Sequence, residues 1–449
     1  MPTIPLGTSA YERKDSFLPE TILKNMIVET QDETVLRIKR PGLTKALRTA
    51  GPINGMYQAD GVLDNFIFYH ANDALYRINA NKAQKIGDIP SDGNVRMVGT
   101  AFNLLGIVAD EKFYLYNGTQ IRELTLPEPA EIPIDIETIN GYFIIACKSG
   151  RFYWLNPGVL GWYNQDGALQ FATAELEADE LVGVKKLGDE IWFFGTTSIE
   201  SWSPTGNSDA ILQRNPGRSY NRGCASRDTI QVFDNNLYWV GDDYVLYSTA
   251  NVPARISNYG IEERLRTNTG QPSAMTFAYN GHLFYVLRIP GQGSFAYDAS
   301  TQTWSEFQTF EFDYWHPHNA IKVGPLTYFG DSYAGNIFNL DPDNRTDDGT
   351  TIECVVSGSL LIPNTKPMRN SSISVTCGSL GENTIQVRWA DQKGAWTQYQ
   401  DMNLTDPLYT ASVWRCGALR QPLRTFEFRF VEDSELTIFV ATFNASYAR

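Results

Sequence analysis

The sequence predicts an all-β protein built around a β-propeller of about seven blades, and three observations lead to this fold class. Aromatic residues make up 13% of the 449 residues, and 36 Gly and 22 Pro accompany them. Aromatic residues favour strands, whereas Gly and Pro favour the turns between strands. A hairpin pattern recurs along most of the chain, and no long amphipathic helix pattern interrupts it.

Seven segments share this pattern, which consists of an aromatic-rich strand, a short polar turn and a second strand. They start at Asp64, Asn103, Gly141, Asp189, Asn235, Gly281 and Pro325. Their mean spacing of about 43 residues matches a four-stranded propeller blade. Rings of six or eight blades, and two unrelated β-sandwiches with many hairpins, are the alternatives.

Polar dipeptides mark the tight turns of these hairpins, as at Asn72-Asp73, Asp110-Glu111 and Ser149-Gly150. Weaker strands lie between the hairpins, for example Val95–Thr100 and Leu181–Lys186. We expect each weaker strand to start a blade near the axis of the ring. The aromatic side chains would then fill the wedge-shaped gaps between neighbouring blades.

Two regions flank the repeats. Residues 1–50 contain one clear strand, Thr34–Arg40, which Pro41-Gly42 ends, and residues 344–449 show short alternating strands typical of a small β-sandwich. The alternating strands are Ile352–Ser357, Ser372–Cys377, Thr384–Trp389, Thr425–Val431 and Leu436–Phe443. We expect residues 1–50 and 344–449 to pack together as one platform, with residues 51–343 inserted as the propeller.

The composition restricts the class of function. The chain has 37 basic and 51 acidic residues and a net charge of −14, which argues against an outer surface that holds nucleic acid.

The five Cys residues are odd in number and far apart, so neither a disulfide framework nor a zinc site is expected. We also expect no secretory signal and no membrane-spanning segment, because every apolar stretch is short.

Catalytic and metal-binding motifs are not found in the sequence. It has no P-loop, GxGxxG, HExxH or GxSxG pattern, so we expect no enzyme activity and no cofactor. His316 and His318 have no neighbouring Cys, His or Asp cluster. The acidic run from Asp341 to Asp348 fails the calcium-loop spacing, because Arg345 stands at the fifth position. We therefore expect no metal site.

Two basic clusters stand out in this acidic chain, and they are the candidate interface or channel contacts. The first consists of Arg37, Lys39, Arg40, Lys45 and Arg48, and the second of Arg214, Arg218, Arg222 and Arg227. The second lies in a stretch that we predict to be a loop, because it is too rich in Gly and Asn for regular sheet. Arginine suits bidentate pairing with phosphate or carboxylate, so we hypothesise that this loop lies at a subunit interface or lumen. The alternative is a solvated strand face and a loop that balances local carboxylates.

Ordered motifs along nearly the whole chain resemble one known family. They include Tyr238-Trp239-Val240-Gly241-Asp242, Arg255-Ile256-Ser257, Gly335-Asn336-Ile337-Phe338 and Thr346-Asp347-Asp348-Gly349-Thr350. A looser hairpin motif, from Asp391 to Trp396, follows in the C-terminal region. The set resembles the packaged-DNA stabilization proteins of short-tailed phages, which are also called tail hub or nozzle proteins.

The resemblance implies a structural virion protein that is assembled in the host cytoplasm into the phage tail. It implies a homo-hexamer, attached to the adaptor ring under the portal, that retains packaged double-stranded DNA and forms its exit channel. It also implies contacts with a tail needle or tip and with tailspikes or fibres, and it carries over no catalytic residue. From the residues alone, a propeller-type carbohydrate-binding protein or glycosidase and a monomeric kelch-like scaffold remain alternatives.

Overall fold

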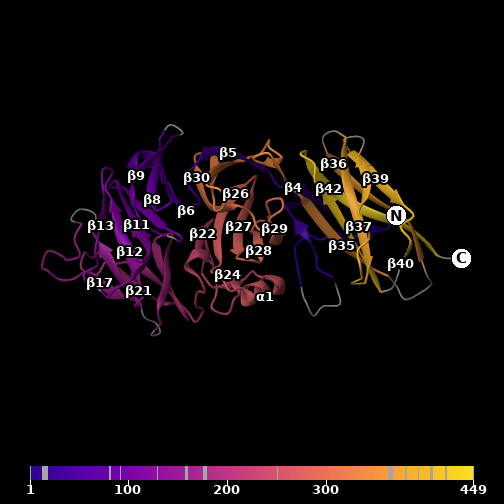
Figure 1. Cartoon of the computed structure of the whole chain (residues 1–449). Helices are drawn as coiled ribbons and strands as arrows, with labels where there is room; N and C mark the ends of the chain where they lie inside the picture. Colours follow the sequence, from indigo (N-terminus) through magenta and orange to yellow (C-terminus); the bar gives the residue numbers. More distant parts are fainter. Residues whose placement is uncertain are drawn as a thin grey trace.

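The computed structural model shows an elongated molecule with a β-propeller at one end and a β-sandwich at the other (Figure 1). The structure describes residues 2–12, 19–79, 82–91, 93–128, 130–156, 160–174, 179–249, 251–362, 368–379, 382–392, 394–404, 408–419 and 422–447. The chain starts and ends in the sandwich, because β1 (Thr3–Ile4) pairs with β42 (Leu436–Tyr447).

Seven four-stranded antiparallel blades follow one another along the chain, as the hairpin count predicts. The first three are β6 (Ile53–Tyr57), β7 (Ile67–Ala71), β8 (Ala74–Asn79) and β9 (Lys82–Asp88); β10 (Arg96–Thr100), β11 (Leu104–Ala109), β12 (Lys112–Tyr116) and β13 (Ile121–Glu123); β14 (Pro133–Ile139), β15 (Tyr142–Cys147), β16 (Arg151–Leu155) and β17 (Phe171–Thr173). The next two are β18 (Leu181–Leu187), β19 (Glu190–Gly195), β20 (Ile199–Pro204) and β21 (Leu212–Tyr220); β22 (Gln231–Phe233), β23 (Asn236–Val240), β24 (Leu246–Thr249) and β25 (Ala254–Arg255). The last two are β26 (Ser273–Tyr279), β27 (His282–Ile289), β28 (Gly293–Asp298) and β29 (Thr303–Glu306); β30 (Pro317–Val323), β31 (Leu326–Asp331), β32 (Asn336–Asp341) and β5 (Gly42–Arg48).

The first strand of each blade lies next to the first strands of the two neighbouring blades, and β30 returns to β6, so the ring is closed. Buried apolar side chains fill every gap between adjacent blades. Between the third and fourth blades, for example, the rings of Phe152 and Phe193 stack with their centroids 4.4 Å apart. The predicted fold class is therefore confirmed, and the aromatic residues pack between the blades as expected.

The N-terminal segment closes the ring. β5 pairs with β32, with Leu43 opposite Leu340, and so becomes the outer strand of the last blade. Residues 42–48 therefore belong to the propeller and not to the platform, and the expected boundary at residue 50 needs this correction. The sequence did not indicate it, because pairing partners almost 300 positions apart leave no local signal.

Two sheet layers form the platform. One layer has the strand order β3 (Met26–Gln31), β4 (Thr34–Lys39), β42, β36 (Met368–Ser379) and β39 (Leu408–Trp414), with β40 (Ala418–Leu419) on β36. The other has the order β2 (Leu23–Lys24), β35 (Cys354–Leu361), β41 (Leu423–Phe430), β37 (Asn383–Asp391) and β38 (Gln400–Leu404). Two minor strands, β33 (Thr346–Asp347) and β34 (Thr350–Thr351), extend the last blade beside β5.

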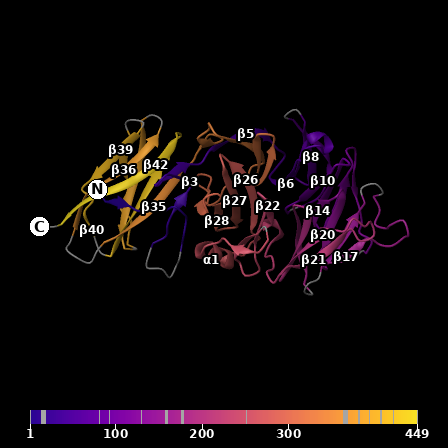
Figure 2. The same cartoon turned by 180° about the vertical axis from the view of Figure 1, so that it is seen from behind.

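The platform and the propeller share both a sheet and a core. β2 pairs with β29 of the sixth blade on one side and with β35 on the other, so one nine-stranded sheet crosses the junction. Figure 2 shows the junction from behind, with β3 of the platform next to the sixth blade. A single apolar cluster joins residues of the fifth and sixth blades, such as Tyr285, to platform residues such as Val356 and Phe428. The division of the chain into separate domains, with the propeller inserted into the platform, stays a prediction.

A short helix at this junction was not predicted. α1 (Tyr259–Thr267) follows the fifth blade, and the Asn258 side chain caps it by accepting a hydrogen bond from the Ile261 amide. Arg264 on α1 contacts two carboxylates of the N-terminal segment, Glu12 at 2.9 Å and Glu20 at 3.3 Å. Burial, and then the nearby carboxylates of Glu306 and Glu12, raise the pKa of Glu20 to about 7.

The raised pKa of Glu20 predicts a specific pH dependence. Because the folded protein binds this proton more tightly than the unfolded chain, stability falls as the pH rises from about 4.5 to about 7. Glu20→Gln should therefore raise the free energy of unfolding at pH 8, by less than about 1 kcal/mol because the side chain is partly exposed. Urea denaturation at pH 4.5 and pH 8 measures this gain, which should be confined to the higher pH.

The matched control is Glu33→Gln, which neutralises an exposed carboxylate in the turn between β3 and β4. It should change stability equally little at both pH values. A gain for Glu20→Gln that is as large at pH 4.5 as at pH 8 would contradict the assignment.

Candidate functional site: the basic clusters and the axial cavity

Three residues of the first basic cluster lie inside the protein. Arg37 on β4 donates to the carbonyls of Gly7 at 2.8 Å and Leu6 at 2.7 Å, and burial lowers the pKa of Arg37 to about 10. Lys39 donates to the Glu432 carbonyl at 2.7 Å, and burial lowers its pKa as well. These two cations hold the N-terminal strands in the platform, and they are not placed to contact another molecule.

Arg40 is the most deeply buried member of that cluster, with 1% of its surface exposed. Its guanidinium forms a bidentate pair with Asp347, at 2.9 and 2.6 Å, and it also donates to Asn25 Oδ1 at 2.9 Å. The indole of Trp315 lies against it, with the ring centroid 5.0 Å away. Arg37, Lys39 and Arg40 are therefore corrected from candidate contacts to structural residues, because all three are buried and donate hydrogen bonds within the chain.

The other two members of the first cluster lie on β5. Lys45 forms an ion pair with Asp348 at the surface of the last blade. Arg48 is exposed, and no ion pair joins it to the described part of the chain. Of this cluster, only Arg48 keeps an exposed side chain without such a pair.

The second basic cluster is not one loop. Arg214 and Arg218 stand on β21, the outer strand of the fourth blade, so the prediction of an irregular loop is wrong for them. A register shift between the pairs Trp202–Arg214 and Glu200–Ser219 accommodates Pro216 and Gly217, whose φ is +80°. An edge strand tolerates this, since it needs hydrogen bonds on one side only.

The four arginines of this cluster also have different surroundings. Arg214 lies 3.7 Å from Glu200 and is half exposed, and Arg218 pairs with Glu190 beside Trp192. Arg222 is exposed and lies over the ring of Tyr247, 5.6 Å from its centroid. Arg227 is the exception, because it points toward the axis of the ring.

An axial cavity of about 360 Å³ lies where the first strands of all seven blades converge. Its polar lining includes Asn54, Lys185, Gln231, Thr276 and Asn319, from five different blades. Glu137 on β14 also lines it and pairs with Lys185 at 3.4 Å. The sequence did not indicate this cavity, since each blade contributes one or two polar residues that look unremarkable by themselves.

Arg227 and its neighbours form a polar network at this cavity, where the inner strands start. Arg227 donates to the Asn94 carbonyl at 2.8 Å and also to the Ile134 carbonyl, so it joins the segments that lead into three blades. Asp228 pairs with Arg96 at 3.1 Å and accepts from Asn94 Nδ2 at 2.7 Å. Burial alone would raise the pKa of Asp228, but Arg96 and Arg227 outweigh it and hold the pKa below its usual value.

His318 completes the network. Burial, and then the nearby Arg288, lower the pKa of His318 to about 4, so its imidazole is neutral at physiological pH. Nε2 lies 2.9 Å from Asn94 Oδ1, which accepts its hydrogen bond because Asn94 Nδ2 already donates to Asp228. In the described residues, no three His, Cys, Asp or Glu side chains come together as a metal site.

A closed ring of seven blades joined to a β-sandwich defines a β-propeller protein. Comparison with known proteins identifies its family. A family model described as "Bacteriophage P22 Gp10, beta-propeller" matches residues 3–345, so the chain belongs to this family. It is 24% identical over 283 residues to tail hub protein gp10 of Salmonella phage P22, which covers 57% of this chain and 59% of that protein. The resemblance to the stabilization proteins of short-tailed phages is confirmed, and this membership supports a structural role in a phage tail.

Solved structures show a weaker likeness. A virginiamycin B lyase from Staphylococcus aureus with quinupristin matches with a TM-score of 0.44 and 14% identity, over 68% of this chain and 98% of that one. The extracellular domain of a putative one-component system from B. thetaiotaomicron matches with a TM-score of 0.47 and 10% identity, over 88% of this chain and 60% of that one. Neither similarity carries an argument about function.

Within the described part of the chain, no helix is long and apolar enough to cross a membrane.

The two neighbouring ion pairs on Asp347 and Asp348 should differ sharply in their contribution to stability. Asp347→Asn leaves the buried Arg40 guanidinium without its counter-ion and should lower the free energy of unfolding by about 3–5 kcal/mol. Lys45→Ala breaks the exposed pair with Asp348 and should cost less than about 1 kcal/mol. Denaturant unfolding of both variants checks the contrast, and equal losses would contradict a structural role for Arg40.

Arg227 and Arg222 should also differ in how much each side chain contributes to stability. Arg227→Ala leaves the carbonyls of Asn94 and Ile134 without this donor and removes one of the two cations beside Asp228, so it should cost about 1–3 kcal/mol. Arg222→Ala should leave the melting temperature unchanged, because that side chain is exposed. Thermal unfolding followed by circular dichroism measures both, and a melting temperature that is unchanged in Arg227→Ala would show that the axial network is dispensable.

Proposed function

We propose that this protein is the subunit of a homo-hexameric tail hub, or nozzle, in the virion of a short-tailed phage. The observation that carries the proposal is the family match over residues 3–345, together with the closed propeller in the same region. In this role the ring of subunits attaches to the adaptor ring under the portal, retains the packaged DNA and forms its exit channel. A tail needle or tip and tailspikes or fibres attach to it, and assembly takes place in the host cytoplasm.

The propeller axis is not the route for DNA in this proposal. The axial cavity is about 360 Å³, and the network of Arg96, Asp228 and His318 crosses it. DNA therefore passes through a lumen between copies of the chain. Each copy has a net charge of −14, so the wall of such a lumen repels phosphates on average and lets the duplex move without being held.

The exposed arginines are the remaining candidates for contact with DNA or with acidic residues of the next subunit. Arg48, Arg214 and Arg222 qualify by their exposure. In a six-fold ring each of them is repeated six times, so even a weak phosphate contact becomes significant. The platform is the candidate surface for the adaptor and for neighbouring subunits.

A carbohydrate-active propeller is the competing function. Such an enzyme needs two carboxyl groups with different roles that face a substrate-sized pocket. The axial cavity does contain Glu137 and Asp228, but Lys185 and Arg96 neutralise them, and the lowered pKa of Asp228 does not suit a general acid. Tyr57 is the aromatic residue that lines this cavity. The geometry therefore favours the scaffold, and the proposal includes neither an enzymatic role nor a cofactor.

Assembly on a portal–adaptor complex tests the proposal. Purified protein mixed with this complex should add a six-fold ring below the adaptor in negative-stain micrographs, even if the free protein is monomeric. The added mass should correspond to six copies of the 50.4 kDa chain. Complexes that stay bare at a high excess of protein would overturn the tail hub assignment.

A further inference from the structure

One outer face of the platform is built from small hydroxyl side chains. On β36, Ile373, Val375 and Cys377 are buried in the core. Because side chains alternate along a strand, Ser372, Ser374 and Thr376 lie on the opposite face, where Ser372 and Ser374 are only 2% and 7% exposed and Thr376 is partly exposed. The neighbouring strands β42 and β39 continue this face on either side of β36.

The strand register arranges the face in three rows. Ser372 lies between Asn444 and Trp414, Ser374 between Thr442 and Ser412, and Thr376 between Val440 and Thr410. β1 adds Thr3 next to Thr442. We call this set the hydroxyl face, and its members are Thr3, Ser372, Ser374, Thr376, Thr410, Ser412, Trp414, Val440, Thr442 and Asn444.

The hydroxyl face costs little to remove from water. Ser374 Oγ lies 2.8 Å from Ser412 Oγ, and Thr376 Oγ1 lies 2.9 Å from Thr410 Oγ1, so these hydroxyls bond across the strands. The backbone groups beneath them are engaged in the sheet, and none of the ten residues is charged. Burial against another protein therefore leaves few polar groups unsatisfied.

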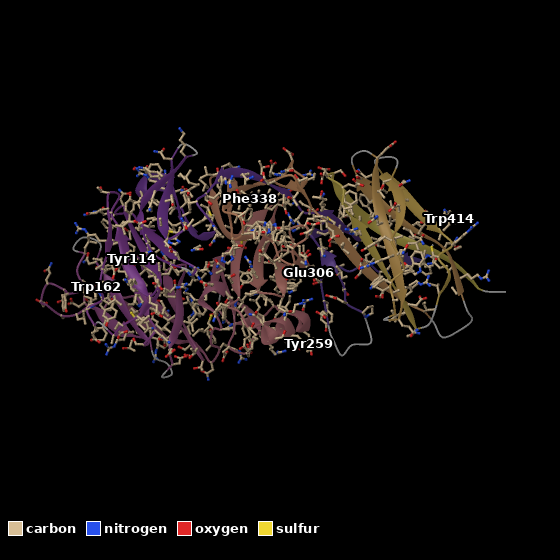
Figure 3. All side chains as sticks on the ribbon, in the orientation of Figure 1. Tyr114, Trp162, Tyr259, Glu306, Phe338 and Trp414 are labelled. Atoms are coloured by element: carbon tan, nitrogen blue, oxygen red, sulfur yellow. The ribbon has the colours of Figure 1, made fainter. Side chains whose placement is uncertain are left out.

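Trp414 gives this face an anchor. Its side chain is 67% exposed, and it lies on the side of the platform away from the propeller (Figure 3). Tryptophan is enriched among the residues whose truncation weakens protein–protein contacts most. Four strands and three rows span roughly 400 Å², which is about half of what one partner buries in a standard interface.

The charge of the chain indicates which partner fits. Two copies that each carry a net charge of −14 repel one another, so a contact between copies needs a surface without carboxylates. The hydroxyl face meets this requirement, whereas a basic partner would gain nothing from it. We propose that the hydroxyl face is one side of the contact between neighbouring copies of this chain, an inference that rests on the proposed ring. A ring with six-fold symmetry requires it to meet a different surface of the next copy.

The test places a charge on this face in the full-length protein. Thr410→Glu puts a carboxylate at an exposed position of β39, where it would be buried uncompensated in the contact. The control, Asn403→Glu, adds the same charge at an exposed position of β38 in the other layer of the sandwich. Both variants should keep the melting temperature of the unmodified protein, because both sites are exposed.

The readout is ring formation on portal–adaptor complexes over a concentration series, followed by negative-stain microscopy and mass photometry. Thr410→Glu should raise the concentration needed for half-maximal ring formation at least tenfold, while Asn403→Glu and the conservative Thr410→Ser should not. Trp414→Ala should also raise it. Single copies of Thr410→Glu should still bind the adaptor.

The outcomes separate two claims, the subunit contact through the hydroxyl face and the tail hub assignment itself. Complete rings of Thr410→Glu at the normal concentration would overturn the inference and leave the tail hub intact. Equal losses for Thr410→Glu and Asn403→Glu would also overturn it, because the effect would then be one of charge anywhere on the platform. If the unmodified protein forms no ring and binds no adaptor, the proposed function fails, and the inference fails with it.

Discussion

The buried Arg40 guanidinium is the interaction on which the arrangement of the whole chain depends. It binds Asn25 in the N-terminal segment, the Gln308 carbonyl at 3.2 Å between the last two blades, and Asp347 beyond the end of the ring. These three segments are distant in sequence and meet only where the chain passes from the platform into the propeller. A guanidinium with five donors can satisfy all of them at once, which a lysine could not do.

This junction explains why the molecule is one connected body. The N-terminal segment runs through the platform as β3 and β4 and then closes the ring as β5, so the chain before the first blade holds the last blade in place. β2 and the shared apolar cluster add a second connection through the sixth blade. Two separate connections resist bending between the platform and the propeller better than a single linker would.

Sequence patterns identified the local structure well and the long-range placement poorly. The predicted strand Thr34–Arg40 corresponds to β4 (Thr34–Lys39), and the aromatic hairpins all appear in the ring. The basic clusters were predicted from adjacency along the chain, which is a poor guide in sheets. Arg214 and Arg227 lie thirteen positions apart, yet one stands on an outer strand and the other faces the axis. The sequence did not predict the helix α1, because nine residues are too few to show a clear helical period of apolar positions.

The sequence by itself determined the repeat, the strand–turn chemistry and the family, because these depend on residues that are neighbours in the chain. The tertiary structure decided which strand closes the ring, which cations are buried and which polar groups converge on the axis. Pairings such as β5 with β32 and contacts such as Arg40 with Asp347 join positions about 300 residues apart. No short-range pattern encodes such contacts, since they form only when closure of the ring brings the two ends of the propeller together.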